Sequence, residues 1–441
     1  MQQRIRVRRL AIRTSLPSAA CIIVLLAGIA WNVRVAVADL LASRDQPSAS
    51  RRAMRLDPVN AAYPAQLAHE LEVTDPQTAQ ALFRQAVRLN PYDAAAWIDL
   101  GLLYEEQGDF SQAESDLLHA ATVDATWLPD WSLANFYFRR QRWDPFWNWA
   151  RKAAQLVPDD ATPILRLAWY VAPKETEIQD RLQVRRPEVQ RQFLWFLIAQ
   201  GDAAAVNQWG IRALASSGAV SWEDVLSACD WLIQQKRPDL ALPLWNGLAA
   251  QHQIPLAAVK SGSGDAVTNG DFARQPLSRG FDWHLTNPDG VSAFLNANPS
   301  ALGFEFSGRE SESILLMSQV VPVEPQQPYT LAVEDASADI PGGSGLEMEV
   351  ADAASGSVLA RTTGFAAGRQ QSRACFTTPQ NVHFLTLMLD YQRQPGTVPL
   401  EGRIAICKIS LLPGTAAECT PLPGVPRSHT SSTFSTDSKS E

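Results

Sequence analysis

The stretch WIDLGLLYEEQGDFSQAESDLLHA, residues 97–120, decides the fold of the first half of the chain because it repeats an earlier stretch. Four of its residues have counterparts of similar type 34 positions earlier: Tyr63 and Trp97, Ala79 and Ala113, Phe83 and Leu117, Ala86 and Ala120. Four matches in a single register mark a repeat. A period of this length predicts pairs of antiparallel helices stacked into a solenoid.

The residue types explain how such a pair would pack. A large aromatic residue on the first helix needs a small surface, and alanine on the second helix supplies it. Gly101 leaves room for a neighbouring helix, and Pro91 lies just past a helix end, where its missing N–H costs least. Asp109 can cap the helix that follows it. On these residues the stretch resembles the tetratricopeptide repeat family, and the resemblance implies an α-solenoid that contacts other proteins.

Length and composition set wider bounds. A chain of 441 residues is long enough for two or three domains with full cores. A net charge of −8 without an evident basic face argues against a nucleic-acid partner. Five cysteines are too few for a scaffold held together by disulfides.

The amino terminus has the pattern of a membrane-targeting segment. Residues 1–15 form a basic head with five arginines and no acidic residue, and residues 16–38 are mostly apolar. We expect an uncleaved transmembrane signal anchor, with a cytoplasmic N-terminus and the bulk of the chain in the periplasm. Ala36-Val37-Ala38 offers the alternative of a cleaved signal peptide and a secreted protein. We expect a single-pass protein of a bacterial inner membrane, and the bacterial assignment rests on the family resemblance rather than on composition.

Residues 46–258 read as the tetratricopeptide-like solenoid. Residues 48–56 look like the closing helix of an earlier, truncated unit. Beyond Pro158 the strict period is lost, but the amphipathic pattern of helices continues. The composition changes at residues 259–264, which we interpret as a short linker.

Residues 265–413 alternate apolar and polar positions in short runs separated by turn signals, which predicts an antiparallel β-sandwich, a jelly roll. The fold class is therefore multidomain α + β: a transmembrane helix, an α-solenoid and a C-terminal sandwich. Residues 414–441 are rich in Pro, Ser and Thr, and we expect a disordered tail.

The start of the sandwich, Asn269-Gly270-Asp271-Phe272 followed by Gly280-Phe281-Asp282-Trp283, resembles jelly-roll carbohydrate-binding modules. The resemblance implies glycan contact through exposed rings and polar groups, for which the candidates are Trp283, His284, Asn296 and Tyr391. The alternative is that the rings near the first strands belong to the core. Family members often hold calcium through an acid before the last strand, but this chain reads Cys407-Lys408-Ile409 there. We expect no metal and no cofactor.

Cys375 and Cys407 lie on separate predicted strands, and an oxidising compartment would let them pair. We predict a disulfide between Cys375 and Cys407, with two separate buried thiols as the alternative.

The segment 127–149 holds more aromatic residues than a two-helix core can bury, so part of it should line a groove for a protein partner. The third copy of the repeat begins here and carries Trp147 where a small residue is expected. The candidate groove residues are Trp131, Phe138, Arg139, Arg142, Trp143 and Phe146. The alternatives are that the rings are inter-repeat core and that the arginines form a solvated polar face.

No catalytic constellation stands out. The six histidines are scattered without metal-ligand spacing, and nucleophile-elbow and phosphate-loop motifs do not occur. We therefore interpret the chain as a non-enzymatic, membrane-anchored envelope adaptor. Its solenoid would bind a protein partner and its sandwich a glycan or a protein, in extracellular polysaccharide assembly or export. The alternatives are a sandwich that is only a protein-contacting or structural cap, and a polysaccharide hydrolase with two distant acids.

Overall fold

The computed structural model describes residues 16–414 except 45, 217–219, 263, 339, 363, 364 and 366. The predicted basic head, residues 1–15, lies outside the described residues. So does the predicted disordered tail beyond Gly414, which includes Cys419.

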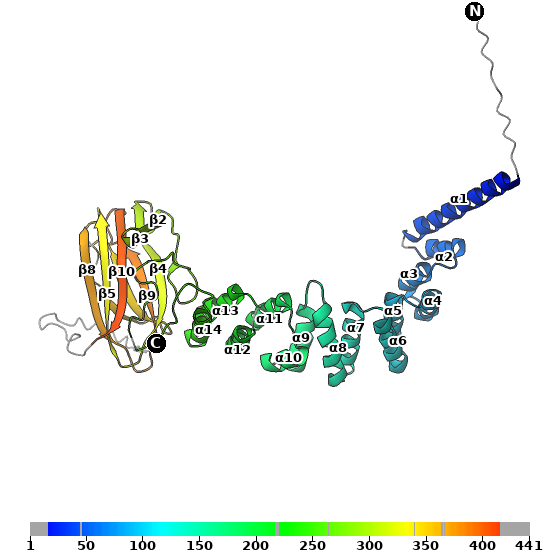
Figure 1. The fold of residues 1–441 in the computed structure, drawn as a ribbon, viewed down its shortest axis with the longest axis horizontal. Helices are drawn as coiled ribbons and strands as arrows, with labels where there is room; N and C mark the ends of the chain where they lie inside the picture. Colours follow the sequence, from blue (N-terminus) through cyan, green and yellow to red (C-terminus); the bar gives the residue numbers. More distant parts are fainter. Residues whose placement is uncertain are drawn as a thin grey trace, which may run out of the picture. The chain divides into compact units, whose positions relative to one another are not determined.

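The chain divides into two compact units, residues 1–192 and residues 193–441. The first unit holds α1 (Leu16–Ala42), α2 (Pro47–Leu56), α3 (Ala62–Leu71), α4 (Pro76–Leu89), α5 (Ala94–Glu106), α6 (Phe110–Val123), α7 (Trp127–Arg139), α8 (Trp143–Leu156), α9 (Thr162–Val171) and α10 (Glu175–Leu182). Helix α11 (Pro187–Gln200) crosses the division, and the second unit continues with α12 (Ala203–Ala215), α13 (Trp222–Gln234) and α14 (Pro238–Ala250). Figure 1 follows these helices along the chain.

The predicted repeat is built as expected, with α3–α4 and α5–α6 as hairpins. Six of the eight residues that define the period are fully buried: Ala79, Phe83, Ala86, Ala113, Leu117 and Ala120. Tyr63 is 3% exposed, and Trp97 is half-buried with its indole N–H donating to the Pro91 carbonyl at 2.9 Å. A Cβ atom on Gly101 would come within 2.9 Å of Leu117, which explains the glycine at this close helix contact. The carboxylate of Asp109 accepts a hydrogen bond from the Gln112 N–H and caps α6, as predicted.

The end of the apolar helix is part of the repeat array. Ala38 and Ala42 of α1 are buried against Ala53 and Tyr63. The Tyr63 hydroxyl donates to Asp39 Oδ1 at 2.6 Å, and burial together with this hydrogen bond raises the pKa of Tyr63 to about 12. Helix α2 therefore does close a first hairpin, and its partner helix is the last part of α1.

The second unit contains the predicted antiparallel β-sandwich. Its strands are β1 (His284–Leu285), β2 (Val291–Ala297), β3 (Ser300–Ser307), β4 (Ser313–Pro322), β5 (Pro328–Ala338), β6 (Leu346–Asp352), β7 (Val358–Arg361), β8 (Gly368–Thr377), β9 (Phe384–Gln392) and β10 (Glu401–Pro413). They form two sheets of five strands, ordered β1-β4-β9-β6-β7 and β2-β3-β10-β5-β8. The two sheets face each other as layers in Figure 1.

The sandwich core is formed by alternate residues of the central strands. Leu385, Leu387 and Leu389 of β9 are fully buried, as are Leu331 and Val333 of β5. Since successive side chains of a strand point to opposite faces, this pattern places one face of each sheet in a shared core. Helices end with α14 and strands begin with β1, on either side of the predicted linker at residues 259–264.

Candidate protein-binding surface and the contact between helices and sandwich

Three aromatic side chains gather on α7, α8 and α9, and we call Phe138, Trp143 and Tyr170 the aromatic patch. The ring of Phe138 lies 6.2 Å from Trp143 and 5.5 Å from Tyr170, measured between ring centroids. Trp143 is 39% exposed and Tyr170 is 76% exposed. Phe146 supports the patch from below, since it is fully buried and its ring lies 5.8 Å from Phe138.

The local chain geometry explains how these rings meet. Phe138 is near the end of α7 and Trp143 begins α8, so a turn of three residues brings them together. The middle residue of that turn, Gln141, has a φ of 53°, the left-handed conformation that ends many helices. Tyr170 comes from the end of α9, the next helix along the chain, which packs on α8.

The arginines of the predicted groove face the preceding hairpin instead. Arg139 donates to both carboxylate oxygens of Glu105, at 2.7 and 2.6 Å. Arg142 donates to Glu114 at 2.9 Å and lies over the Tyr137 ring. These side chains therefore join α7 and the start of α8 to α5 and α6 while both guanidinium groups remain about half exposed. Whether Arg139 and Arg142 line a groove or form a solvated polar face stays a prediction.

Of the six groove candidates, the structure brings Phe138, Trp143 and Phe146 together. Trp131 lies about two turns earlier on α7 and is half-buried. Tyr170 was missed, although its place at the end of a helix whose buried face is Leu165 and Ala168 was a usable signal. Protein binding at the aromatic patch stays a prediction.

The sequence profile of the tetratricopeptide repeat family matches residues 70–144. This range carries the repeat. A fold of this family suggests a protein-interaction scaffold. No curated protein matches the chain.

Solved structures also resemble parts of the chain. A crystal structure of MamA is 17% identical and covers 32% of this chain and 94% of its own, with a TM-score of 0.25. A second MamA crystal structure is 18% identical, covering 28% of this chain and 70% of its own, with a TM-score of 0.25. A structure described as "CBM4 structure and function" is 10% identical, covering 34% of this chain and 99% of its own, with a TM-score of 0.27.

Two of the predicted glycan contacts are core residues, so their assignment to stacking was wrong. Trp283 is 0% exposed and packs 5.9 Å from the Phe272 ring. Tyr391 is 1% exposed, and its hydroxyl donates to Glu310 at 3.3 Å. Burial raises the pKa of Tyr391, with Glu310 adding to the shift. The alternation of β9 carried this information, since Tyr391 continues the inward positions of its leucines.

The other two candidates do not share a surface patch. His284 is half-buried on β1, with Nε2 2.9 Å from the carbonyl oxygen of Gly280. Asn296 is exposed on β2, at the edge of the other sheet. Glycan contact through either side chain stays a prediction.

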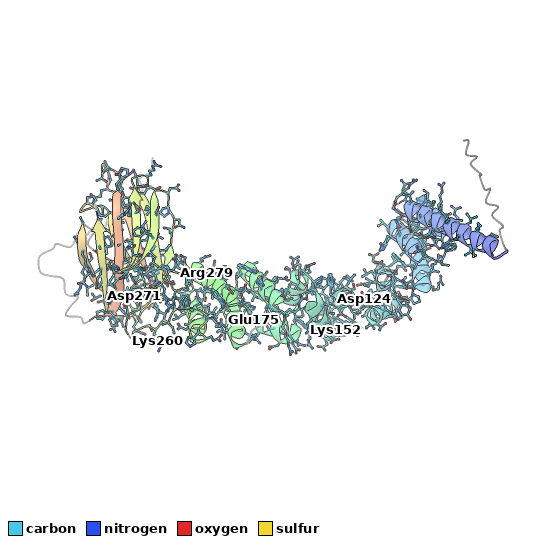
Figure 2. The ribbon with its side chains drawn as sticks, turned by 45° about the horizontal axis from the view of Figure 1, so that its top comes forward. Asp124, Lys152, Glu175, Lys260, Asp271 and Arg279 are labelled. Atoms are coloured by element: carbon cyan, nitrogen blue, oxygen red, sulfur yellow. The ribbon has the colours of Figure 1, made fainter. Side chains whose placement is uncertain are left out.

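Within the second unit, the sandwich is joined to α13 by a carboxylate. Asp230 accepts hydrogen bonds from Arg279 Nε at 2.5 Å and from the backbone N–H of Gly280 at 2.6 Å. Arg279 Nη2 also donates to Ser227 at 2.9 Å. Arg279 is labelled at this junction in Figure 2. We call these contacts the Asp230 clasp.

Aromatic packing reinforces the clasp. Gly280 has a φ of +58°, and a Cβ atom there would lie 2.5 Å from the Trp245 ring of α14. Phe281 packs edge-on against Trp245 at 6.0 Å and lies 6.4 Å from Phe384 of β9. The Gly-Phe-Asp-Trp motif therefore does two things: Trp283 enters the sandwich core, while Gly280 and Phe281 contact the helices.

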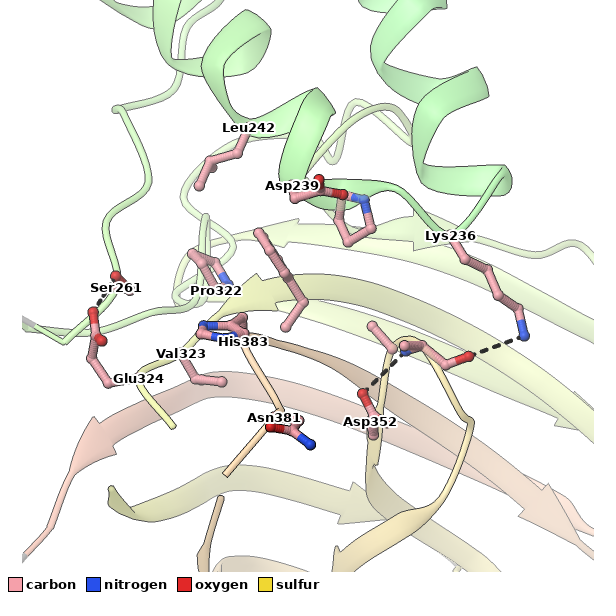
Figure 3. A pocket seen from close by; sticks show the side chains of 14 residues that line it. Lys236, Asp239, Leu242, Ser261, Pro322, Val323, Glu324, Asp352, Asn381 and His383 are labelled. Carbon is pink, nitrogen blue, oxygen red and sulfur yellow. Dashed lines mark hydrogen bonds between the residues drawn. The ribbon is translucent and has the colours of Figure 1, made fainter. Parts of the chain in front are cut away.

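A cavity of about 530 Å³ lies beside this junction (Figure 3). Lys236, Asp239 and Leu242 line it from the helices, and Glu324 and Asp352 from the sandwich. Several of its polar groups hold chain segments in place: Lys236 Nζ donates to the Ala354 carbonyl at 3.2 Å, and Ser261 donates to Glu324 at 2.5 Å. Within the described residues, no group of three or more His, Cys, Asp or Glu could hold a metal ion.

The predicted disulfide between Cys375 and Cys407 is wrong, because Cys407 is a free thiol. Cys375 lies on β8 and Cys407 on β10, and β5 lies between these strands. Neighbouring strands are about 4.8 Å apart, so the two residues are separated by roughly 10 Å across the sheet. Disulfides need Cα atoms within about 7 Å. Cys375 is nevertheless disulfide-bonded.

We expect thiol mapping of the denatured, unreduced protein to label Cys407, Cys21 and Cys229, and to leave Cys375 unlabelled. The Cys407→Ser variant should lose one labelled thiol, whereas Cys375→Ser should gain one, because the sulfur that Cys375 binds becomes free. Mass spectrometry of labelled peptides measures both. A linked peptide pair containing Cys375 and Cys407 would contradict the structure.

Proposed function

We propose that this protein is a membrane-anchored, non-catalytic scaffold that binds a protein partner at the aromatic patch. The observation that supports it is the contact of Phe138 with two exposed rings, Trp143 and Tyr170, which gathers exposed aromatic surface from three helices in one cluster. Clustered aromatic rings that stay in water are typical of interface hot spots. The family match at residues 70–144 supports the same class of function.

The partner segment should present apolar side chains, most simply one face of an amphipathic helix laid on the patch. Asp144 follows Trp143 and its side chain is 97% exposed, with Arg181 at 3.9 Å. A basic residue flanking the apolar face of the partner would complement this carboxylate. We propose that the partner is a subunit of machinery that polymerises or exports extracellular polysaccharide. This class is suggested by the combination of an anchor, repeats and a sandwich in one chain.

Anchoring is supported by α1, which is long and apolar enough to cross a membrane. By length and composition the candidate span is Ala20–Ala42, but its last turns, with Ala38 and Ala42, pack on the repeats, so the membrane-crossing part lies before them. A cleavage after Ala38 would cut the helix where Ala38 is fully buried and beside the Asp39 carboxylate that Tyr63 binds. These contacts favour the uncleaved anchor over a cleaved signal peptide. The bacterial inner membrane, with the repeats and sandwich in the periplasm, is part of the proposal and rests on the layout of basic head, apolar helix and repeats. In this proposal the sandwich is a structural or protein-contacting cap, because two of its predicted glycan-contacting rings are core residues.

The test is in-cell crosslinking followed by purification of the full-length protein. The double variant Trp143→Ala/Tyr170→Ala removes two rings of the patch. Trp195→Ala/Tyr92→Ala is the matched control, since it removes one exposed tryptophan and one exposed tyrosine elsewhere, 52% and 82% exposed. We expect the patch variant to capture the polysaccharide-machinery subunit at least about tenfold less well than the wild type. The control should change capture less than about twofold.

Equal capture by the wild type and the patch variant, with unchanged helical circular dichroism in both, would overturn the proposed patch. Loss of capture in the control as well would also count against it, because the effect would not be specific to these rings.

A further inference from the structure

The first hairpin, formed by the end of α1 and by α2, has exposed arginines at the end nearest the predicted membrane span. Helix α1 is continuous from Leu16 to Ala42, and its last part, from Arg34 onward, packs on α2 and α3. This leaves Leu16–Val33 for the bilayer, about 27 Å at 1.5 Å per residue. A bilayer core of about 30 Å fits that length. Arg34 therefore marks the level at which the helix leaves the hydrocarbon.

The position of Trp31 agrees with a membrane boundary at Arg34. It is 51% exposed, and the guanidinium of Arg34 lies 5.5 Å from the centre of its ring. Tryptophan and arginine are enriched at the boundary between hydrocarbon and headgroups. Gln66 Nε2 donates to the Ala42 carbonyl at 2.6 Å, so the far end of α1 belongs to the folded repeats.

Helix α2 runs back along α1 toward this boundary. Arg34 Nε donates to the carbonyl oxygen of Leu56, the last residue of α2. The carboxyl end of α2 and the turn after it therefore lie at the level of Arg34. The buried face of α2 is Ala49, Ser50 and Ala53, while Arg52 and Arg55 are exposed. In the following turn Val59 is 68% exposed, an apolar side chain at the same end of the hairpin.

Three carboxylates, Asp39, Asp57 and Glu70, lie on or beside the helices of this hairpin, and Asp39 is exposed. Asp39 accepts the Tyr63 hydroxyl, and Glu70 accepts the hydroxyl of Ser50 at 2.7 Å. Asp57 is buried, 7% exposed. Asp39 lies five residues beyond Arg34 on α1, farther from the bilayer. The exposed charged groups at Arg34, at the carboxyl end of α2 and in the turn after it are therefore guanidinium groups, which bind phosphate oxygens with paired N–H donors.

We propose that Arg34, Arg52 and Arg55, with Val59 inserted beside them, bind the phosphate headgroups of anionic phospholipids. We call this surface the arginine rim. It rests on the proposed membrane anchoring and adds a lipid preference to it. Its consequence is mechanical: the first hairpin lies directly on the bilayer, so the repeat array begins at the membrane surface without a flexible stalk.

The test measures the lipid that the full-length protein retains. Protein in detergent is incubated with equal amounts of phosphatidylglycerol and phosphatidylcholine, and bound lipids are counted by native mass spectrometry. For the wild type we expect a ratio of bound phosphatidylglycerol to bound phosphatidylcholine well above one. In Arg52→Gln/Arg55→Gln this ratio should fall about fivefold for each arginine removed. Arg88→Gln/Arg166→Gln removes two exposed arginines of α4 and α9 and should keep the wild-type ratio.

An unchanged ratio in Arg52→Gln/Arg55→Gln, or an equal fall in the control pair, would overturn the proposal. Inorganic phosphate in excess over lipid should not displace phosphatidylglycerol, and displacement would mean that the surface binds phosphate in general. Carbonate extraction of cell membranes tests the anchor separately. Release of the protein would refute the anchoring itself. Retention in the membrane with an unchanged lipid ratio would refute only the arginine rim.

Discussion

Replacing Trp283 by alanine is expected to lower the free energy of unfolding of the sandwich by about 3–5 kcal/mol. The side chain is 0% exposed, and it packs against Phe272 in the core. Truncation to alanine removes the transfer energy of the indole and leaves a cavity between rigid strands. A loss of this size takes a large share of the stability of an ordinary domain.

Two companion variants make this result specific. Trp283→Phe keeps most of the apolar volume, so it should cost much less than Trp283→Ala. Trp195→Ala removes an indole that is 52% exposed and should be close to neutral. Denaturant unfolding of the solubilised protein, with limited proteolysis of residues 265–413, measures the effect. A stable Trp283→Ala protein would show that the ring is outside the core and would restore it as a candidate for glycan stacking.

Substituting Gly280 by alanine is expected to detach the sandwich from α13 and α14 while the sandwich itself stays folded. The φ of +58° costs an L-residue roughly 1–2 kcal/mol. The added Cβ would also lie 2.5 Å from the ring of Trp245, which is fully buried and has little room to shift. Overpacking of this kind adds about 1–3 kcal/mol. The core of the sandwich is spared because Gly280 lies in the loop before β1.

Gly356→Ala is the matched control for backbone strain. Its φ is +75°, but no atom lies within 4 Å of the Cβ position, so only the strain is added. Asp230→Ala tests the same contact from the helical side by removing the acceptor of Arg279 and Gly280. Hydrogen exchange of α13 and α14 should become faster in Gly280→Ala and Asp230→Ala and stay unchanged in Gly356→Ala. Equal exchange in all three variants would refute the role of the Asp230 clasp.

The helical repeat was predictable because it is a local code. Each hairpin needs an aromatic residue, two alanines and a cap at fixed spacing, and Ala79, Ala113 and Asp109 are read directly from the order of residues. The sandwich was predictable because the alternation of apolar and polar residues along each strand is also a local pattern. The sequence pattern does not reveal β1, β2 or α10, for three different reasons. Strand β1 has only two residues, and β2 is mostly exposed at the edge of its sheet. Helix α10 has eight residues, and two of the four that it buries, Glu175 and Gln179, are polar.

The candidate site was predictable only in part. Excess aromatic residues in segment 127–149 indicated a surface, and Phe138, Trp143 and Phe146 do meet there. Tyr170 joins them from the next helix, α9, and the direction of the Arg139 side chain depends on Glu105, 34 positions earlier. Which rings are covered and which stay in water depends on neighbours that periodicity does not reveal.

The order of residues alone therefore predicts the solenoid, the sandwich and the apolar helix. The first two follow from the spacing of apolar positions along helices and strands, and the third follows from a continuous apolar run. Long-range contacts are a different matter. The failed disulfide is the clearest case: Cys375 and Cys407 lie on strands of one sheet, but β5 lies between them, and only strand order shows this. The Asp230 clasp and the packing of α1 as the first repeat helix are likewise visible only in the tertiary structure. Asp230 accepts a hydrogen bond from Gly280, 50 residues later, and Tyr63 donates one to Asp39, 24 residues earlier, and neither pairing follows from a local pattern.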